Sequence, residues 1–182
     1  MGGGDPAHKD HTKQARNIMK KHIEVAAAIV AWEGKVLCMR RGRGGSPSTE
    51  MKWEFPGGKV EPGETPQETI VRELLEEMDY AVEPVRRVER ASHEYPDFSI
   101  TLEAWLCRAA TPLFSMKEHT AFRWMPPREA GKLDFAAADR DILSALAAMA
   151  PTIESGEALT PDAKGSGHDN GEESQETVSA QD

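Results

Sequence analysis

Residues 65–78 restrict the fold of this chain most, because they predict a helix with two unlike faces. Thr65-Pro66-Gln67-Glu68 forms a capping box with proline at the first helical position, and the helix is expected to end at about Met78. Apolar side chains recur along it at helical spacing: Ile70, Val71, Leu74, Leu75 and Met78. A helix that buries only one stripe needs another layer to cover that stripe, so the domain must contain a sheet or further helices.

The opposite face of this helix carries three carboxylates. At about 100° per residue, Glu76 lies about 60° from Glu73, and Glu77 lies about 40° to the other side of Glu73. Clustered carboxylates repel one another, and a hard cation such as Mg²⁺ or Mn²⁺ compensates because it prefers oxygen ligands. A cation bound there would polarise a phosphorus centre and lower the pKa of a bound water. The alternative is a solvated acidic helix face, which is the ordinary interpretation of a charge run.

The residues around the triplet favour the metal-binding interpretation. Gly58 follows another glycine, which allows the backbone to come close enough for a carbonyl to join a metal shell. Arg72 lies beside the triplet in sequence and is placed to pair with a glutamate such as Glu64, which would fix the orientation of that carboxylate.

Apolar runs on both sides of this helix predict β-strands. Residues 25–31 form a small-apolar run that fits a buried strand, and residues 32–35 predict the turn of a hairpin. Further strands are expected at 35–40, 53–55, 82–95, 99–109 and 121–125, with a stop at Pro56-Gly57-Gly58, a helical turn at 127–130 and a second helix over 136–149. This order of strands around two separated helices predicts an α/β layered domain with a mixed sheet.

We expect one domain, over residues 23–150, between two polar segments. Residues 1–22 are rich in Gly, His and Lys and are expected to form a flexible arm, with a short helical piece at 15–21. Pro151 is expected to end the second helix. Residues 151–182 hold eight acidic residues and one Lys with almost no large apolar side chains, so this tail is expected to be disordered.

Charge and apolar content disfavour several classes of partner. The formal net charge of -9 does not favour binding to DNA or to an anionic membrane. No apolar segment is long enough to span a bilayer, and the first residues lack the basic start and apolar stretch of a signal peptide. We therefore expect a cytoplasmic protein whose two cysteines, Cys38 and Cys107, are reduced and buried. The oligomeric state is not predicted.

The segment from Gly58 to Tyr80 resembles the Nudix box, Gly-x5-Glu-x7-Arg-Glu-U-x-Glu-Glu-x-Gly-U, in which U is a bulky apolar residue. The matching positions are Gly58, Glu64, Arg72, Glu73, Leu74, Glu76, Glu77 and Tyr80. The one departure is Asp79, which stands where the family has the glycine that ends the helix. Aspartate tolerates a left-handed cap, so we expect a small stability cost rather than a loss of chemistry.

The similarity extends over residues 23–148. Residues 53–59 and 133–139 are similar to the MutT-related subgroup, which includes 8-oxo-dGTP diphosphatases and CTP pyrophosphohydrolases. The resemblance implies an α/β/α sandwich and hydrolysis of a nucleoside diphosphate linked to a further group. In triphosphates the attack is often on the β-phosphorus, which yields a nucleoside monophosphate and pyrophosphate.

The resemblance also implies roles for individual residues. Glu73, Glu76 and Glu77, with the Gly58 carbonyl, would be metal ligands, and Arg72 and Glu64 would support them. Glu118 stands where the subgroup has a further metal ligand or general base; the alternative is an ordinary loop glutamate. We interpret the neighbouring His119 as a bystander.

Four residues are candidates for contact with the substrate. Asp139 stands where guanine-oxidation enzymes of this subgroup have an asparagine that reads the base, and its alternative role is a helix cap. Phe98 replaces an arginine and would either stack on a base or fill the core. Arg41 and Arg43 follow the second strand and are placed to reach phosphates, although a solvated loop is an equal alternative for Arg43.

Three functions remain open from the sequence. The first is a Mg²⁺-dependent pyrophosphohydrolase of single nucleotides, with 8-oxo-dGTP and cytidine or modified pyrimidine triphosphates as candidate substrates. The second is an ADP-ribose or nucleotide-sugar hydrolase, which residues 53–59 support less well. The third is a Nudix-like module that binds a nucleotide without turnover; such a module should lose carboxylates, yet all three helix glutamates are present.

Overall fold

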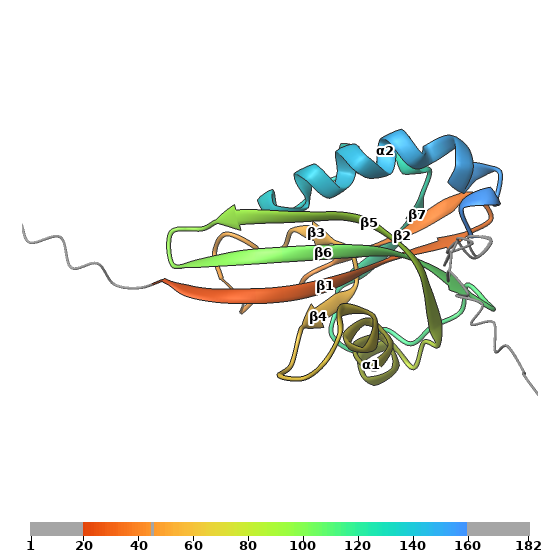
Figure 1. Ribbon diagram of the computed structural model, residues 1–182. Helices are drawn as coiled ribbons and strands as arrows, with labels where there is room; N and C mark the ends of the chain where they lie inside the picture. The colour runs from red at the N-terminus through yellow and green to blue at the C-terminus, as the bar shows by residue number, and fades with distance from the viewer. Residues whose placement is uncertain (1–19, 45, 160–182) are drawn as a thin grey trace, which may run out of the picture.

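The computed structural model describes residues 20–44 and 46–159, which form one mixed sheet between two helical layers (Figure 1). The strands are β1 (Lys21–Trp32), β2 (Lys35–Arg40), β3 (Trp53–Glu54), β4 (Gly57–Lys59), β5 (Val82–Glu94), β6 (Phe98–Ala109) and β7 (Ala121–Met125). The α-helices are α1 (Pro66–Met78) and α2 (Arg140–Glu154), with short 3-10 turns η1 (Pro127–Lys132), η2 (Ala137–Asp139) and η3 (Glu157–Leu159). The two α-helices lie on opposite faces of the sheet, which confirms the predicted α/β/α sandwich.

β1 is the strand around which the sheet is organised. The main path of the sheet is β3-β2-β1-β6-β5, and β1 runs parallel to β6 along almost its whole length. Along the other edge of β1, two partners follow one another. β4 pairs antiparallel with the middle of β1, where Ala27 faces Gly57, and β2 pairs with the end of β1, where Ala31 faces Val36. The predicted hairpin between β1 and β2 is therefore confirmed, within a sheet that mixes parallel and antiparallel pairs.

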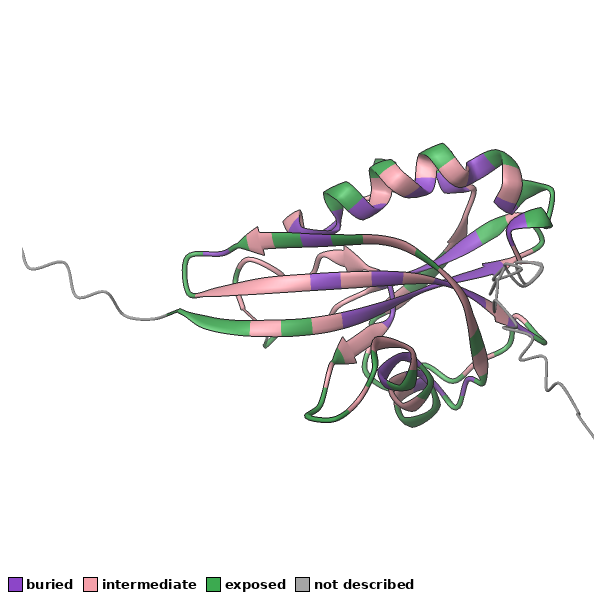
Figure 2. Cartoon of the chain, in the orientation of Figure 1, coloured by how far each residue is buried: buried purple, intermediate pink, exposed green. Residues whose placement is uncertain are grey.

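The apolar run in β1 is continuous because both faces of the strand are buried (Figure 2). Ala27, Ile29 and Ala31 belong to the core under α2, together with Ile142 and Leu146. The alternate side chains Ala26, Ala28 and Val30 belong to the core under α1. Each face of the sheet thus has its own apolar layer.

Helix α1 begins and ends where the sequence predicts. The Thr65 side chain accepts a hydrogen bond from the Glu68 N–H, and the Glu68 carboxylate accepts one from the Thr65 N–H. The predicted apolar stripe needs one correction, because Val71 and Leu75 are 41% and 55% exposed. The contact with the sheet is a narrow line through Ile70, Leu74 and Met78, and these two side chains lie beside that line.

The ends of the domain differ from the expected boundaries. Pro151 does not end α2, which continues to Glu154. Proline lacks the N–H of a helical hydrogen bond, which lowers local helix stability. The helix end and η3 nevertheless bury Ile153 and Ala158 in the core. β1 begins at Lys21, inside the segment expected to be an arm, because pairing with β6 extends that far. Except for its last two residues, the helical piece expected at 15–21 lies outside the described residues.

Two other expectations concern the chain as a whole. Cys38 and Cys107 are both buried and unpaired. Within residues 20–44 and 46–159, no helix combines the length and the apolarity that crossing a membrane requires.

Candidate active site

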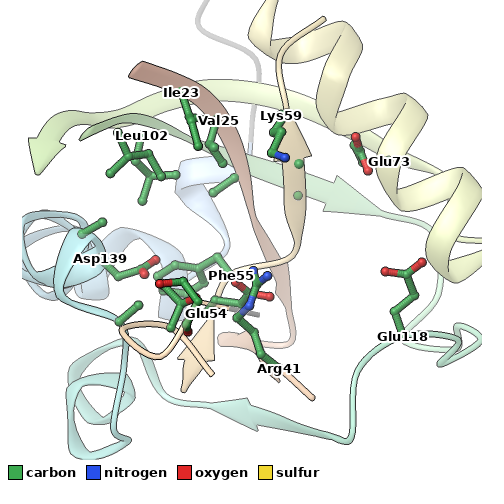
Figure 3. Close-up of a pocket in the computed structure, with 18 of the residues that line it drawn as sticks. Ile23, Val25, Arg41, Glu54, Phe55, Lys59, Glu73, Leu102, Glu118 and Asp139 are labelled. Atoms are coloured by element: carbon green, nitrogen blue, oxygen red, sulfur yellow. Dashed lines mark hydrogen bonds and ion pairs between the residues drawn. The ribbon is translucent and has the colours of Figure 1, made fainter. Parts of the chain in front are cut away.

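A cleft of about 920 Å³ lies between the two helical layers, on the side of β1 that carries β4. Figure 3 shows Asp139 and Glu118 on opposite sides of it, with Arg41 and Glu54 between them and Glu73 projecting from α1. These residues come from five separate segments of the chain, so the fold assembles the site from residues that are far apart in sequence.

β4 brings the glycine pair against both β1 and α1. A Cβ atom at Gly57 would collide with the carbonyl oxygen of Ala26 on β1, and a Cβ at Gly58 would collide with the carboxylate of Glu73. Position 57 therefore needs glycine because the backbone of β1 occupies the space of a side chain, whereas a side chain at position 58 would displace the Glu73 carboxylate. The structure thus places Gly58 and Glu73 side by side. The strand before Pro56-Gly57-Gly58 ends as predicted, but Gly57–Lys59 then forms a strand of its own, which the sequence did not predict.

Arg72 binds one carboxylate that precedes α1 and one that lies on it. Its Nε and Nη2 atoms donate to the two oxygens of Glu64 at 2.6 and 2.9 Å, and its Nη1 donates to Glu73 at 2.8 Å. Arg72 holds the pKa of the Glu64 carboxyl down at about 2, helped by hydrogen bonds from the Thr69 hydroxyl and the Glu61 N–H. This arrangement matches the expected pairing of Arg72 with Glu64.

The acidic side chains do not all face the cleft. Glu73, Glu77 and Glu118 line it, whereas the Glu76 side chain is 62% exposed and lies 3.4 Å from Arg72. Burial raises the pKa of Glu77, the negative charges of Glu118 and Glu73 raise it as well, and together they bring it to about 7. Glu77 therefore lies in a crowded acidic environment.

These residues fit a hard divalent cation. Their donors are carboxylate oxygens, and the raised pKa of Glu77 indicates negative charge that the neighbouring side chains do not neutralise. Among the described residues, no three acidic, histidine or cysteine side chains lie close enough together to coordinate one metal ion as they stand. Glu76 would join a metal site in the cleft only by turning away from Arg72.

At the other end of the cleft, Asp139 is a buried carboxyl group. It is 5% exposed and occupies the cap position of α2, but its side chain makes no capping hydrogen bond. The alternative role as a helix cap is therefore wrong. Burial raises the pKa of Asp139 well above its ordinary value, the negative charge of Glu54 adds to this, and Arg41 opposes it.

Polar contacts centred on Glu54 lie between the two ends of the cleft. Glu54 accepts from Arg41 Nη1 at 2.7 Å and lies 3.0 Å from the Nε2 atom of His119, whose side chain is only 8% exposed. Sequence reasoning missed Glu54 and set His119 aside. The available signal was a single acidic residue between Trp53 and Phe55 in a short apolar strand.

The remaining candidates lie at the margin of the cleft. Phe98 lines it and also packs on Tyr95, with 4.7 Å between ring centroids, so its position is compatible with both a base contact and a core role. Arg41 is turned toward Glu54, and Arg43 is exposed in the loop after β2.

Residues 20–146 match the NUDIX domain, so the chain belongs to the Nudix family. A CTP pyrophosphohydrolase from Escherichia coli is 36% identical over 129 residues, which cover 71% of this chain and 94% of that protein. An 8-oxo-dGTP diphosphatase from Escherichia coli is 32% identical over 126 residues, covering 69% of this chain and 97% of that protein. The chain is thus a Nudix hydrolase of the MutT type.

Solved structures of Nudix hydrolases also resemble this fold. The solution structure of the DNA mismatch repair protein MutT from Staphylococcus aureus, a Nudix hydrolase, is 34% identical and superposes with a TM-score of 0.60. The match covers 71% of this chain and 98% of that one.

Proposed function

We propose that this chain is a Mg²⁺-dependent pyrophosphohydrolase that converts a nucleoside triphosphate to the monophosphate and pyrophosphate. The observation that carries the proposal is the division of one cleft into two chemically different ends. One end holds Glu73, Glu77 and Glu118, and the other holds the buried carboxyl group of Asp139. A nucleotide offers the matching pair of groups, a polyphosphate and a base.

The acidic end would hold the cation and the triphosphate. Glu73, Glu76 and Glu77 would be its ligands, with the Gly58 carbonyl and Glu118. Mg²⁺ or Mn²⁺ bound there would neutralise the phosphate chain and lower the pKa of a bound water. Arg72 holds the Glu64 and Glu73 carboxylates in place through its hydrogen bonds. An ionised glutamate beside the reacting phosphorus is placed to accept the proton of the attacking water, and Glu118 is our candidate for this role.

Asp139 would read the base as a neutral acid. A protonated carboxyl group has one O–H donor beside an acceptor oxygen, as an amide side chain has one donor group and one acceptor. Cytosine presents an amino donor beside an acceptor nitrogen, and 8-oxoguanine presents a ring N–H beside a carbonyl oxygen. Unmodified guanine presents two acceptors, N7 and O6, on the same edge, and a single carboxylic acid has only one donor for them. Asp139 is thus compatible with both substrate types named for the two Escherichia coli relatives.

The other candidates have less support. An ADP-ribose pyrophosphatase from Bacillus subtilis is 34% identical, but over only 84 residues, or 46% of this chain. A binding module without turnover would not need the Glu77 environment, which costs stability without a ligand. Action on single nucleotides rather than nucleic-acid polymers, and a location in the cytoplasm, remain predictions.

Steady-state hydrolysis with Mg²⁺ tests the proposal. The panel would contain 8-oxo-dGTP, dGTP, CTP, dCTP, 5-methyl-dCTP and ADP-ribose, with pyrophosphate and phosphate measured separately. We expect pyrophosphate from 8-oxo-dGTP or a cytosine nucleotide, and slower release from dGTP. Turnover of ADP-ribose alone would replace the proposal with the second candidate, and no turnover would favour the binding module.

A further inference from the structure

The segment that carries Glu118 runs from β6 to β7 across the C-terminal end of α1, and it is anchored on both sides of Glu118. On the β-sheet side, His119 Nε2 lies 3.0 Å from Glu54, and the Thr120 N–H donates to the Arg40 carbonyl at 2.9 Å. On the helix side, the Ser115 N–H donates to the Met78 carbonyl at 2.8 Å.

The second anchor on the helix side depends on the side chain of Asp79, which stands where the Nudix box has glycine. Lys117 Nζ donates to the carboxylate of Asp79 at 2.9 Å and to the Glu76 carbonyl at 2.8 Å. The Ser115 side chain is a further hydrogen-bond partner of the Asp79 carboxylate. A glycine at position 79 could offer none of the contacts made by this carboxylate.

The backbone role of position 79 is separate from these contacts. Asp79 has φ 49° and ψ 37°, and its N–H donates to the carbonyls of Leu74 and Leu75. Glycine adopts this left-handed conformation more easily and keeps the same N–H. The helix end therefore needs only the backbone of residue 79, and the carboxylate is available for another purpose.

We propose that Asp79 is a positioning residue, which holds Lys117, and through it Glu118, against the helix that carries Glu73 and Glu77. Glu118 is exposed and makes no hydrogen bond of its own among the described contacts, so its place over the cleft depends on its neighbours in the chain. Asp79 and Glu54 fix the two sides of the segment. This inference rests on the proposed function, because it assigns Glu118 to the metal end of the cleft.

The test is Asp79→Gly, which restores the residue of the family pattern. Its readouts are kcat, KM, the affinity for Mn²⁺ without nucleotide measured by electron paramagnetic resonance, and hydrogen exchange of residues 110–120 in metal-free protein. We expect kcat and Mn²⁺ affinity to fall about twofold to fivefold, the range typical of an exposed ion pair. Exchange of the segment should rise, while KM and Tm stay the same or Tm increases.

Lys117→Met supplies the second arm, and Lys132→Met is the matched control because Lys132 forms an exposed ion pair with Glu129 away from the cleft. The double variant Asp79→Gly/Lys117→Met should be no worse than Lys117→Met alone. Wild-type values in Asp79→Gly, or a lower Tm with unchanged kcat and Mn²⁺ affinity, would overturn the inference. Failure of the wild-type protein to hydrolyse any nucleotide would instead overturn the proposed function, and the Mn²⁺ and exchange measurements would still decide the role of Asp79.

Discussion

Helices α1 and α2 cover opposite faces of the same sheet, yet their ends are determined differently. The local sequence determines both ends of α1, since a capping box begins it and a residue in the left-handed backbone conformation ends it. Helix α2 has no side-chain cap at its start and continues through Pro151. Its limits depend on tertiary burial, above all on Ile153. Local chemistry defines the helix that carries the proposed metal ligands, and packing defines the helix that follows the proposed base reader.

The largest expected effect concerns α1. Glu77→Gln and Glu76→Gln should each lower kcat about 10²- to 10⁴-fold, because each removes a charge that the proposed cation requires. Steady-state kinetics at saturating Mg²⁺ measures this, with Glu129→Gln as an exposed control. A Glu76 variant with normal turnover would mean that the outward position of Glu76 in the structure persists during catalysis, and that only the cleft-lining pair binds metal.

Removal of the end of α2 should chiefly affect stability. Deletion of residues 151–182 removes the buried side chain of Ile153, and truncation of a buried isoleucine costs about 2–5 kcal/mol. Thermal unfolding should show a clear fall in Tm. Deletion of 160–182 alone is the control and should change neither Tm nor turnover. Equal Tm values for the two deletions would show that the end of α2 contributes nothing to the core.

Asp139 should affect specificity more than the chemical step. Asp139→Ala removes both the donor and the acceptor, so kcat/KM for the preferred nucleotide should fall about tenfold to hundredfold, as for loss of a bidentate base contact. Asp139→Asn keeps a donor and an acceptor and should retain most of the activity. If the asparagine variant is as poor as the alanine variant, the neutral-acid model of base reading is wrong.

The smallest effect is a pH dependence of stability in metal-free protein. A glutamate with a pKa raised from 4.5 to about 7 binds more protons folded than unfolded in that interval. The stability from Glu77 is thus fully present below pH 4.5 and is lost as pH rises through about 7. The raised pKa of Asp139 acts in the same direction.

Thermal unfolding from pH 5 to pH 8 measures this loss. We expect Tm to fall by a few degrees, since about 1 kcal/mol corresponds to about 2–4 °C in a chain of this size. Glu77→Gln should flatten the profile, and Mg²⁺ should restore Tm at the upper end because metal binds the ionised carboxylates. A Tm that rises over this range would contradict the assignment.

The same division explains what the sequence could predict. The order of the elements, α1 with its caps, and the pairing of Arg72 with Glu64 follow from residues close together in the chain. β4 was missed because its pairing with β1 is a long-range contact. Glu54 and His119 were missed for the same reason, since they meet only after β3 and the segment before β7 are brought together.

Each of the two apolar cores, on either side of the sheet, contains one buried cysteine. Cys38 belongs to the core under α2 and Cys107 to the core under α1. Burial raises the pKa of Cys38 to about 12 and that of Cys107 further, so neither thiol forms the reactive thiolate while its layer is closed. Alkylation of each cysteine therefore reports how often its own layer opens. The two cysteines are therefore native probes with which the opening of the two cores can be measured independently.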